Sequence, residues 1–539
     1  MGFQVSPGVQ VKEIDLTNVI PAVSTSIGAI AGAFQWGPVG EIITVGSEKE
    51  LVSRFGKPNN DTFSYFMPAA SFLKYGRSLR VVRADATGAS ASTAALNASS
   101  GNGDPATSTN VTVGNDDVFD DGNLTTLDET VGSWIAKFPG AMGNGLTVNV
   151  VKSTTTPDNI TDLFDTLPDA DEIHVAVVDS LGNFGQVGVV IETFAFLSTV
   201  EGTVGTDGTN NYFVDVINAT SRYIRSNPFT GFDLAASVLS GGTASPALDL
   251  GDLKDGFDLF ADTETVDVNL IIQGPANANR DLANHLIALA TTRKDCVAFV
   301  SPPIATTKQN PNATTDLITW ADGLTSSSYG VIDSTALYVY DKYADVYRWI
   351  SASGAVAGLC AKTDDVADPW WSPAGFNRGQ LFGVTKLAFN PKHFERDELY
   401  KKRINPIVTF PGEGTLLYGD KTAQSKPSAF DRINVRRLFI VLEKAIATAA
   451  KYQLFEFNDE FTRAQFRNMV EPFLRDVKGR RGLYDFHVVC DETNNTGQVI
   501  DTNQFIADIY IKPARSINFM TLNFIATRTG VEFSEIIGK

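Results

Sequence analysis

Hydrophobic positions in the last third of the chain follow a helical repeat. Apolar residues recur at spacings of three and four between Val435 and Ala449, which predicts a long helix that begins near Asp431 and buries one face. A second helix is predicted to open at Thr462, because Gln465 three residues later completes a capping-box pattern. This part of the chain is therefore expected to contain two amphipathic helices.

Short strands and helices alternate in two earlier stretches. The first is predicted to contain, in order, a strand at 41–45, helices at 48–55 and 65–75, and a strand at 79–82. The second is predicted to contain a strand at 266–272, a helix at 281–292 and a strand at 296–300. Because the strands of such a β–α–β unit are parallel, a buried parallel sheet is expected.

A segment of different character lies between these stretches. A Ser-, Ala-, Thr-, Gly- and Asn-rich run at 87–112 indicates a domain boundary. Strand-like runs follow it at 146–151, 173–178, 186–194 and 212–217. Between Gly88 and Asp267, 26 acidic residues stand against five basic ones, a net charge of −21. The segment is predicted to be an inserted, water-facing domain whose charge either only keeps the protein soluble or also steers partners.

These patterns predict a multidomain α/β (α+β) chain with six segments. In order, they are an N-terminal extended arm at 1–20, the first part of the αβ core at 21–87, an acidic, β-rich outer insertion at 88–265, a middle αβ domain with the β–α–β unit at 266–365, a C-terminal inner αβ domain at 366–515, and a C-terminal strand or arm at 516–539.

Both ends of the chain read as extended segments. The apolar residues of the N-terminal segment come near a period of two around a Ser-Pro-Gly turn: Phe3, Val5, Val9, Val11 and Ile14. The C-terminal segment carries a similar set: Ile517, Phe519, Met520, Leu522 and Phe524. Twenty extended residues can reach roughly 65 Å, far enough to leave the parent domain. The alternative for the N-terminal segment is an ordinary edge strand of its own sheet.

Patterns that carry catalysis or bind metal ions are missing. The four histidines stand apart and the three cysteines form no CxxC pair, so neither a metal centre nor a redox site is predicted. The nearest phosphate-binding loop, Gly414 to Thr422, has one residue too many before its lysine and carries Asp420, whose charge would repel a phosphate. We expect no enzyme and no cofactor; a nucleotide-hydrolysing protein that uses this loop is the alternative.

Charge and hydropathy narrow the possible partners. The chain of 539 residues carries 44 basic and 62 acidic side chains, a net charge of −18 that argues against nucleic acid. The longest charge-free stretch, 16–40, is broken by prolines and glycines, so it predicts no membrane span. The opening residues match the short myristoylation pattern MGxxxS, but nothing else in the sequence indicates a membrane. We therefore expect the protein to bind neither nucleic acid nor a membrane.

Basic residues concentrate around the two predicted C-terminal helices. Between Asp431 and Arg481, eleven Lys and Arg residues stand against seven acidic ones. They form either solvated helix faces with internal ion pairs or a surface complementary to an acidic partner. Nine are candidates for the second role: Arg432, Arg436, Arg437, Arg463, Arg467, Arg475, Lys478, Arg480 and Arg481.

Several short motifs resemble those of a known family. They are Ser6 to Gly8, Phe34 to Pro38, Leu79 to Arg83, Ser372 to Gly379, Tyr418 to Ala423, Asp431 to Phe439 and Ala514 to Asn518. On these motifs the chain resembles the contractile tail sheath proteins of bacteriophages, of the T4-like type. The resemblance covers about 1–85 and 260–539; the segment between them matches weakly and is shorter than in the longer T4-like sheaths.

The resemblance implies a structural, non-enzymatic subunit of the virion. Such subunits stack as six-membered rings in a helical sleeve around a tail tube made of a different protein, and contraction drives the tube through the host envelope. The implied partners are further copies of the chain, the tube protein, and the baseplate and tail terminator proteins, with assembly in the host cytoplasm. Both arms would link subunits, and the nine basic residues would face the tube. A pyocin-type or secretion-system sheath is the alternative.

Overall fold

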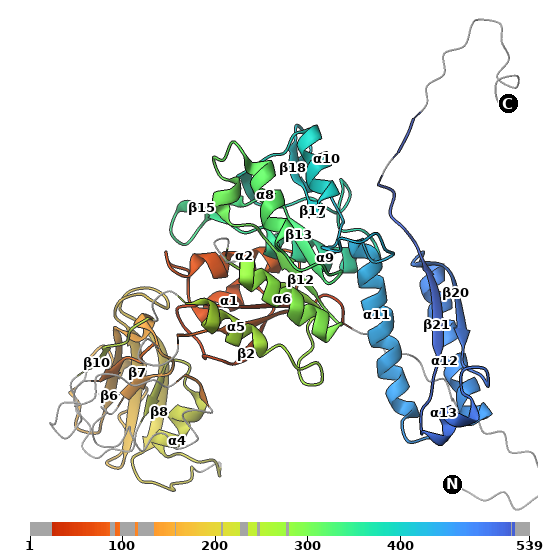
Figure 1. Cartoon of the computed structure of the whole chain (residues 1–539). Helices are drawn as coiled ribbons and strands as arrows, with labels where there is room; N and C mark the ends of the chain where they lie inside the picture. The colour runs from red at the N-terminus through yellow and green to blue at the C-terminus, as the bar shows by residue number, and fades with distance from the viewer. Residues whose placement is uncertain are drawn as a thin grey trace, which may run out of the picture.

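The molecule consists of three parts, each with its own hydrophobic core. The computed structural model describes residues 24–86, 92–97, 114–116, 134–156, 158–205, 208–226, 236–244, 248–275, 280–518 and 520–522. Buried apolar side chains within these ranges form three separate cores. Figure 1 shows the corresponding parts: the central body in the middle, the insertion at the lower left and the C-terminal unit on the right. The expected mixed αβ, multidomain fold is confirmed.

The central body is built on a sheet of seven strands among the described residues, in the order β17-β13-β12-β11-β1-β3-β2. The bounds are β1 Gly28–Gly32, β2 Ile42–Val45, β3 Leu79–Arg83, β11 Leu270–Ile272, β12 Val297–Val300, β13 Gly330–Asp333 and β17 Ile404–Asn405. All neighbours are parallel except β2 and β3. The predicted parallel β–α–β unit is confirmed by β11, α6 and β12. Because β1 lies between β3 and β11, strands from before and after the insertion share one sheet.

Helices cover both faces of the central sheet. Those of the body are α1 Glu48–Phe55, α2 Phe63–Leu73, α5 Leu250–Asp258, α6 Arg280–Arg293, α7 Ile304–Thr307, α8 Ala313–Asp322, α9 Ser353–Val366 and α10 His393–Lys401. A Cβ atom at Gly32 of β1 would collide with Tyr65 of α2, whereas the neighbouring Ala31 lies against Gly256 of α5. Successive strand residues point to opposite faces, so α2 and α5 lie on opposite sides of the sheet.

Two smaller sheets complete the central body. One consists of β14 Leu337–Asp341, β15 Val346–Ile350 and β16 Val384–Leu387, in the order β15-β14-β16. The other is the hairpin of β18 Ile407–Phe410 and β19 Gly414–Leu417. The first four residues of the candidate phosphate-binding loop, Gly414–Leu417, therefore form strand β19.

The insertion is a second, antiparallel sheet with the strand order β8-β7-β6-β10-β4-β5-β9 among the described residues. Its elements are β4 Leu96–Asn97, β5 Trp134–Ala136, η3 Ala141–Gly143, β6 Leu146–Val151, η4 Thr161–Leu163, β7 Glu172–Asp179, β8 Val189–Ser198, α4 Phe213–Thr220, β9 Ile224–Ser226 and β10 Ser237–Ser240. An isolated bridge pairs Thr93 with Thr243, so the chain leaves and rejoins the body at one place.

One predicted strand of the insertion is wrong. Residues 212–217 were expected to be extended, but α4 runs from Phe213 to Thr220. Its buried residues are Phe213, Val214 and Ile217, which is the spacing of one helix face rather than of alternating strand positions. A short apolar run fits both periods, and packing against the sheet decides for the helix.

The C-terminal unit consists of two long helices and a small sheet. Its elements are α11 Ile433–Ala450, η5 Lys451–Gln453, α12 Glu460–Gly479, β20 Leu483–Val489, α13 Gly497–Asp501 and β21 Asp508–Pro513. Helix α11 belongs to two cores, because Ile433 and Ile440 pack into the central body while Leu438 and Leu442 pack against α12. The helix thereby joins the two parts. Within the described ranges, no helix has the length and apolar character that a membrane span requires.

The predicted start of the second helix was three residues late. The N-cap of α12 is Asp459, whose side chain accepts a hydrogen bond from the amide of Thr462 at 2.8 Å. Thr462 is therefore the third residue of the helix and not its cap. Aspartate and threonine are both good N-cap residues, so the capping-box pattern alone could not choose between them.

Candidate assembly surfaces

The sheet of the C-terminal unit offers two strand edges. Antiparallel β20 and β21 pair only with each other among the described residues, with Phe486 opposite Ile511 and His487 opposite Tyr510. One face packs on the core through residues such as Val488, and the other exposes Tyr484 and Tyr510. Each strand therefore has one edge whose backbone groups can pair with an added strand.

Residues 514–518 lead away from β21 and are held by a polar cluster, here named the Asp420 anchor. Asp420 is buried and accepts four side-chain hydrogen bonds from described residues. The donors are Ser372 Oγ at 3.1 Å, Tyr400 Oη at 3.0 Å, Ser516 Oγ at 2.7 Å and Asn518 Nδ2 at 2.9 Å. Burial, and next the Asp420 carboxylate, raise the pKa of Tyr400 above its usual range, so this hydroxyl keeps its proton.

Helix α11 takes part in the Asp420 anchor at its first turn. The amide of Ile433 donates to the backbone oxygen of Asp420 at 2.8 Å, and Arg432 donates to the hydroxyl of Tyr400 at 2.9 Å. The next residue, Asn434, donates from Nδ2 to the backbone oxygen of Ala514 at 3.3 Å. The start of α11 and the segment after β21 are thus fixed to one point of the central body.

The loop considered for phosphate binding is occupied by this cluster. The carboxylate of Asp420 serves the four donors, and Nζ of Lys421 donates to the backbone oxygen of Tyr400 at 2.7 Å. A phosphate loop needs its lysine and its backbone amides free for the ligand. The nucleotide-hydrolysing alternative therefore finds no support in this geometry.

At the other end of the described chain, Ser24 and Thr25 are held by α11 in a second cluster, here named the Arg437 anchor. Arg437 donates from Nη2 to the backbone oxygen of Thr25 at 3.2 Å and to Oδ2 of Asp364 at 2.6 Å. The hydroxyl of Thr25 donates to the same carboxylate oxygen at 2.7 Å. Two turns on, Nζ of Lys444 lies 3.5 Å from the backbone oxygen of Ser24 and forms an ion pair with Asp267.

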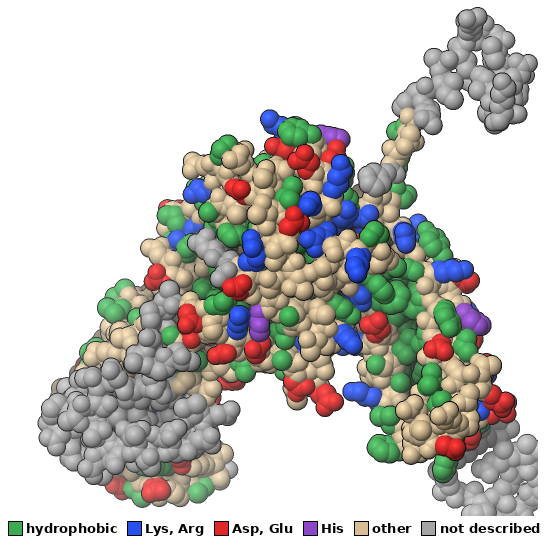
Figure 2. Space-filling model, in the orientation of Figure 1, with side chains coloured by type: hydrophobic (Ala, Val, Ile, Leu, Met, Phe, Trp, Pro, Cys, Tyr) green, Lys and Arg blue, Asp and Glu red, His purple; other side chains and the backbone are tan. Residues whose placement is uncertain are grey.

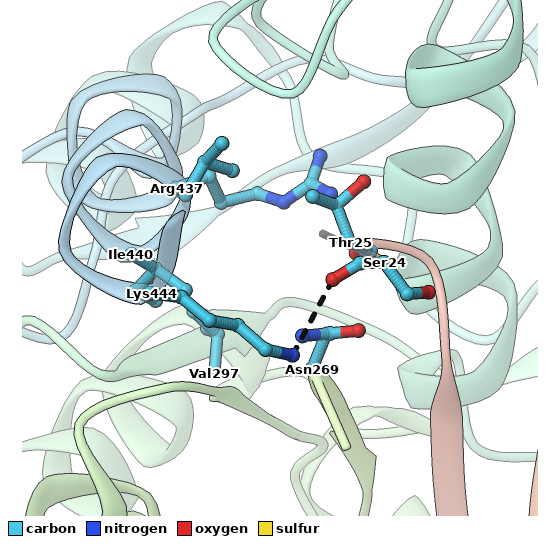
Figure 3. A pocket seen from close by; sticks show the side chains of 8 residues that line it. Ser24, Thr25, Asn269, Val297, Arg437, Ile440 and Lys444 are labelled. Carbon is cyan, nitrogen blue, oxygen red and sulfur yellow. Dashed lines mark hydrogen bonds between the residues drawn. The ribbon is translucent and has the colours of Figure 1, made fainter. Parts of the chain in front are cut away.

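Figure 3 shows how this second anchor is built. Arg437 and Lys444 reach from α11 toward Ser24 and Thr25, which lead directly into β1. A cavity of about 10 Å³ lies between them, and Asn269 also lines it. This space is at the lower limit of what holds one water molecule.

The nine basic candidates occupy different environments. Figure 2 shows Lys and Arg side chains gathered where the central body meets the C-terminal unit. Arg436, Arg437 and Arg463 are buried, whereas Arg432 and Arg467 are partly exposed. The remaining four are exposed: Arg475, Lys478, Arg480 and Arg481.

The three buried arginines are bound within the chain, so the prediction that they face a partner does not fit them. The guanidinium of Arg436 lies between the rings of Tyr329 and Phe430, at 4.2 and 4.1 Å from their centroids. Arg463 donates to the side chain of Asn458 at 2.9 Å. These three arginines fit the alternative prediction better, in which the basic residues make contacts within the chain.

The predicted linking residues at the two ends fall partly outside the described ranges. Phe3, Val5, Val9, Val11 and Ile14 all lie outside them, as do Phe519 and Phe524. The described residues of the C-terminal set are Ile517, Met520 and Leu522, with exposed fractions of 81%, 74% and 68%. These three side chains are apolar and uncovered in the single chain, as a segment that packs elsewhere would require.

The sequence interpretation missed an apolar tip between α11 and α12. Its members are exposed in the single chain: Tyr452, Leu454, Phe455, Phe457 and Phe461. Phe455 has a positive φ of 71°, a conformation that costs energy for a residue with a Cβ atom. The density of aromatic residues in 452–461 was the available signal.

Comparisons with known proteins agree with the resemblance noted in the sequence. Three family models match: "Tail sheath protein Gp18 domain III N-terminal region" at 25–84, "Phage tail sheath protein central domain" at 251–423 and "Phage tail sheath C-terminal domain" at 425–527. The matches leave 85–250 uncovered. The tail sheath proteins of Vibrio phage KVP40 and Enterobacteria phage T4 are each 35% identical to this chain, over 99% of both sequences.

Those two alignments span 668 and 657 positions although this chain has 539 residues, so both relatives contain segments that it lacks. Solved structures share the fold at lower identity. The sheath tail protein Lin1278 from Listeria innocua is 13% identical with a TM-score of 0.57, covering 92% of this chain and 96% of that one. The contracted helical sheath of the anti-feeding prophage is 14% identical with a TM-score of 0.53, covering 97% and 100%.

Proposed function

The chain belongs to the tail sheath protein family of contractile bacteriophages, and from this premise we propose how its subunits join. As a member it is a structural component of the contractile tail in the virion. In our proposal, copies of the chain stack as six-membered rings in a helical sleeve around a tail tube made of a different protein. The baseplate and tail terminator proteins lie at the two ends of the sleeve, and assembly takes place in the host cytoplasm.

The subunits are linked by exchange of their terminal segments. The N-terminal arm (1–20) and the C-terminal arm (516–539) of neighbouring copies add strands to the β20–β21 sheet. The observation that carries this proposal is the presence of two strand edges without a partner among the described residues. Added strands gain main-chain hydrogen bonds without needing a deep pocket. The exposed Ile517, Met520 and Leu522 become covered in the same step.

The tube lies against the exposed basic residues of α12 and the turn that follows it. Arg475, Lys478, Arg480 and Arg481 retain exposed charge, although Lys478 and Arg480 also pair with Asp485 and Asp368. Charges at the rim of an interface steer approach and set register more than they add affinity. This arrangement suits a sleeve that must later move relative to the tube.

Contraction moves each subunit as a rigid body while the exchanged arms keep neighbours connected. Rigid-body rearrangement about preserved links is a common form of large structural transition. The contracted arrangement buries more surface than the extended one, and this difference drives the tube through the host envelope.

The test of linkage compares two variants with one control by negative-stain electron microscopy. Deletion of residues 1–20 removes the N-terminal arm, and the pair Ile517→Asp and Leu522→Asp places charge where apolar contact is proposed. Both should remain folded monomers that form no striated sleeves. The control Leu181→Asp changes an exposed apolar residue of the insertion and should assemble normally. Ordered sleeves from the deletion variant would refute arm exchange.

A further inference from the structure

We propose that helix α11 carries the mechanical load between the two arms, and that the Asp420 and Arg437 anchors protect the adjoining strands from being pulled apart. The inference rests on the proposed exchange of arms. It assigns a role to the residues at the root of each arm: they determine where a pull on that arm enters the molecule.

The C-terminal anchor lies between the arm and a sheet that has two strands among the described residues. The chain passes from β21, which ends at Pro513, through Ser516 and Asn518 to the arm. A sheet of two strands is marginally stable on its own. Tension beyond residue 518 reaches the Asp420 anchor first, before it can peel β21 from β20 one hydrogen bond at a time.

The Asp420 anchor is built to resist such tension. Its hydrogen bonds end on one carboxylate, and bonds to an ionised acceptor are roughly twice as strong as neutral ones. Asp420 is only 2% exposed, so water competes little for these bonds. Since Ile433 at the start of α11 bonds to the backbone of the same aspartate, the load passes directly to the helix.

The N-terminal anchor occupies the equivalent position at the other end of the chain. Ser24 and Thr25 stand between the N-terminal arm and β1, which is paired on both sides within the central sheet. Arg437 and Lys444 hold their backbone oxygens. A pull on this arm therefore enters α11 as well, instead of drawing on β1 and the core around it.

One helix therefore links the two anchors. From Arg432 to Lys444 is twelve residues, about 18 Å along the helix axis at 1.5 Å per residue. This part of α11 packs into the central body through Ile433 and Ile440 and into the C-terminal unit through Leu438 and Leu442. The load path between arms is thus short, and both ends of it are embedded in hydrophobic core.

The test uses variants that weaken each anchor without changing an arm. Tyr400→Phe removes the hydroxyl that donates to Asp420 at 3.0 Å and accepts from Asn518 at 2.8 Å, and Tyr418→Phe, at an exposed tyrosine of the central body, is its control. Lys444→Met removes the charge that holds Ser24, and Lys451→Met, exposed at the end of the same helix, is its control. Circular dichroism and thermal melting of the monomers establish that each variant is folded.

Sleeves of each variant, grown with tube protein where the chain alone does not polymerise, are then sheared through a narrow capillary and their lengths measured by electron microscopy. We expect all variants to form sleeves, and the two anchor variants to break into shorter pieces than the wild type and the two controls. Equal lengths after shear would overturn the proposal. So would failure of the anchor variants to assemble while their controls do, because the anchors would then serve assembly rather than load.

These outcomes are distinct from failure of arm exchange. If arms do not link subunits, the 1–20 deletion forms sleeves, and that result is obtained before any shear experiment. The other case is that the wild type requires its arms for assembly but the anchor variants resist shear as well as the wild type does. Arm exchange then stands, and only the load-bearing role of α11 is refuted.

Discussion

Arg437 and Asp364 form a buried ion pair that ties α11 to α9. Nη2 of Arg437 donates to Oδ2 of Asp364 at 2.6 Å, and the two side chains are 4% and 7% exposed. The residues are 73 positions apart in the sequence. The pair therefore connects the C-terminal unit with the helix layer of the central body, and it does so next to the root of the N-terminal arm.

Removing one member of this pair should destabilise the monomer strongly. Arg437→Met leaves the Asp364 carboxylate buried without its cation, and such changes cost about 3–5 kcal/mol. The double variant Arg437→Met with Asp364→Leu should lose less, because no buried charge remains. Urea unfolding of the soluble monomer measures both, with Arg475→Met as the exposed control. A double variant less stable than Arg437→Met alone would contradict this account.

Asp333 should make the stability of the protein depend on pH. It ends β13, accepts a hydrogen bond from the hydroxyl of Ser301, and burial raises its pKa to about 8. In an unfolded chain the pKa is about 3.9. Between these values the folded protein holds a proton that the unfolded chain has released, so stability falls as pH rises from about 4 to 8, by up to about 1.4 kcal/mol per pH unit.

Asp333→Asn keeps an oxygen to accept the hydrogen bond from Ser301 and removes the titration. The variant should therefore gain stability over the wild type as the pH increases from 5 to 8. Urea unfolding at both values gives the difference. A stability gap that is the same at pH 5 and pH 8 would show that Asp333 does not titrate in this window.

Helices α2 and α9 should tolerate no added methyl group where they meet. A Cβ atom at Gly354 would lie 2.1 Å from the backbone oxygen of Pro68. Because backbone must move to admit it, Gly354→Ala should cost about 1–3 kcal/mol or more. Gly479→Ala, at the last residue of α12 with open space around it, is the control and should change stability little. Thermal melting compares the two; equal melting temperatures would argue against a rigid contact.

The exposed basic residues should contribute a salt-dependent attraction to the tube. The double variant Arg475→Glu with Arg481→Glu should bind purified tube protein more weakly at low salt. Each of the two substitutions should cost about 1 kcal/mol, which is about fivefold in affinity. The difference should shrink at high salt as the charges are screened. Lys57→Glu on the exposed surface of the central body is the control. Co-sedimentation at two salt concentrations gives the result, and a salt-independent loss would point to misfolding instead.

Helices and strands could be predicted where one sequence signal, a cap residue or a clear periodicity of apolar residues, dominated. Helix α1 has the predicted bounds of 48–55, since Ser47 caps it and its buried residues keep helical spacing. Helix α6 and strand β6 also match closely. The strand assigned to 212–217 failed because Phe213, Val214 and Ile217 suit both periods, and only the sheet on which they pack distinguishes a helix.

The surfaces were less predictable than the elements. Charge counts identified a basic region but could not separate Arg436, inserted between two rings, from Arg475 in solvent. The local sequence around Asp420 indicates a loop, whereas two of its donors, Ser516 and Asn518, lie 96 and 98 residues away. Contacts of that separation leave no local pattern, although both partners lie in motifs that supported the family resemblance.

The clasp between Thr93 and Thr243 has a consequence for how the outer surface can change. Their hydroxyl oxygens lie 2.7 Å apart and their backbones pair, so the two ends of the insertion are held side by side, while Trp36 and Val39 of the central segment make further contacts with it. The strands on either side of β1 pair without any contribution from that excursion. Another water-facing domain could therefore replace the insertion and leave the central sheet paired as it is, provided that the new domain also covers Trp36.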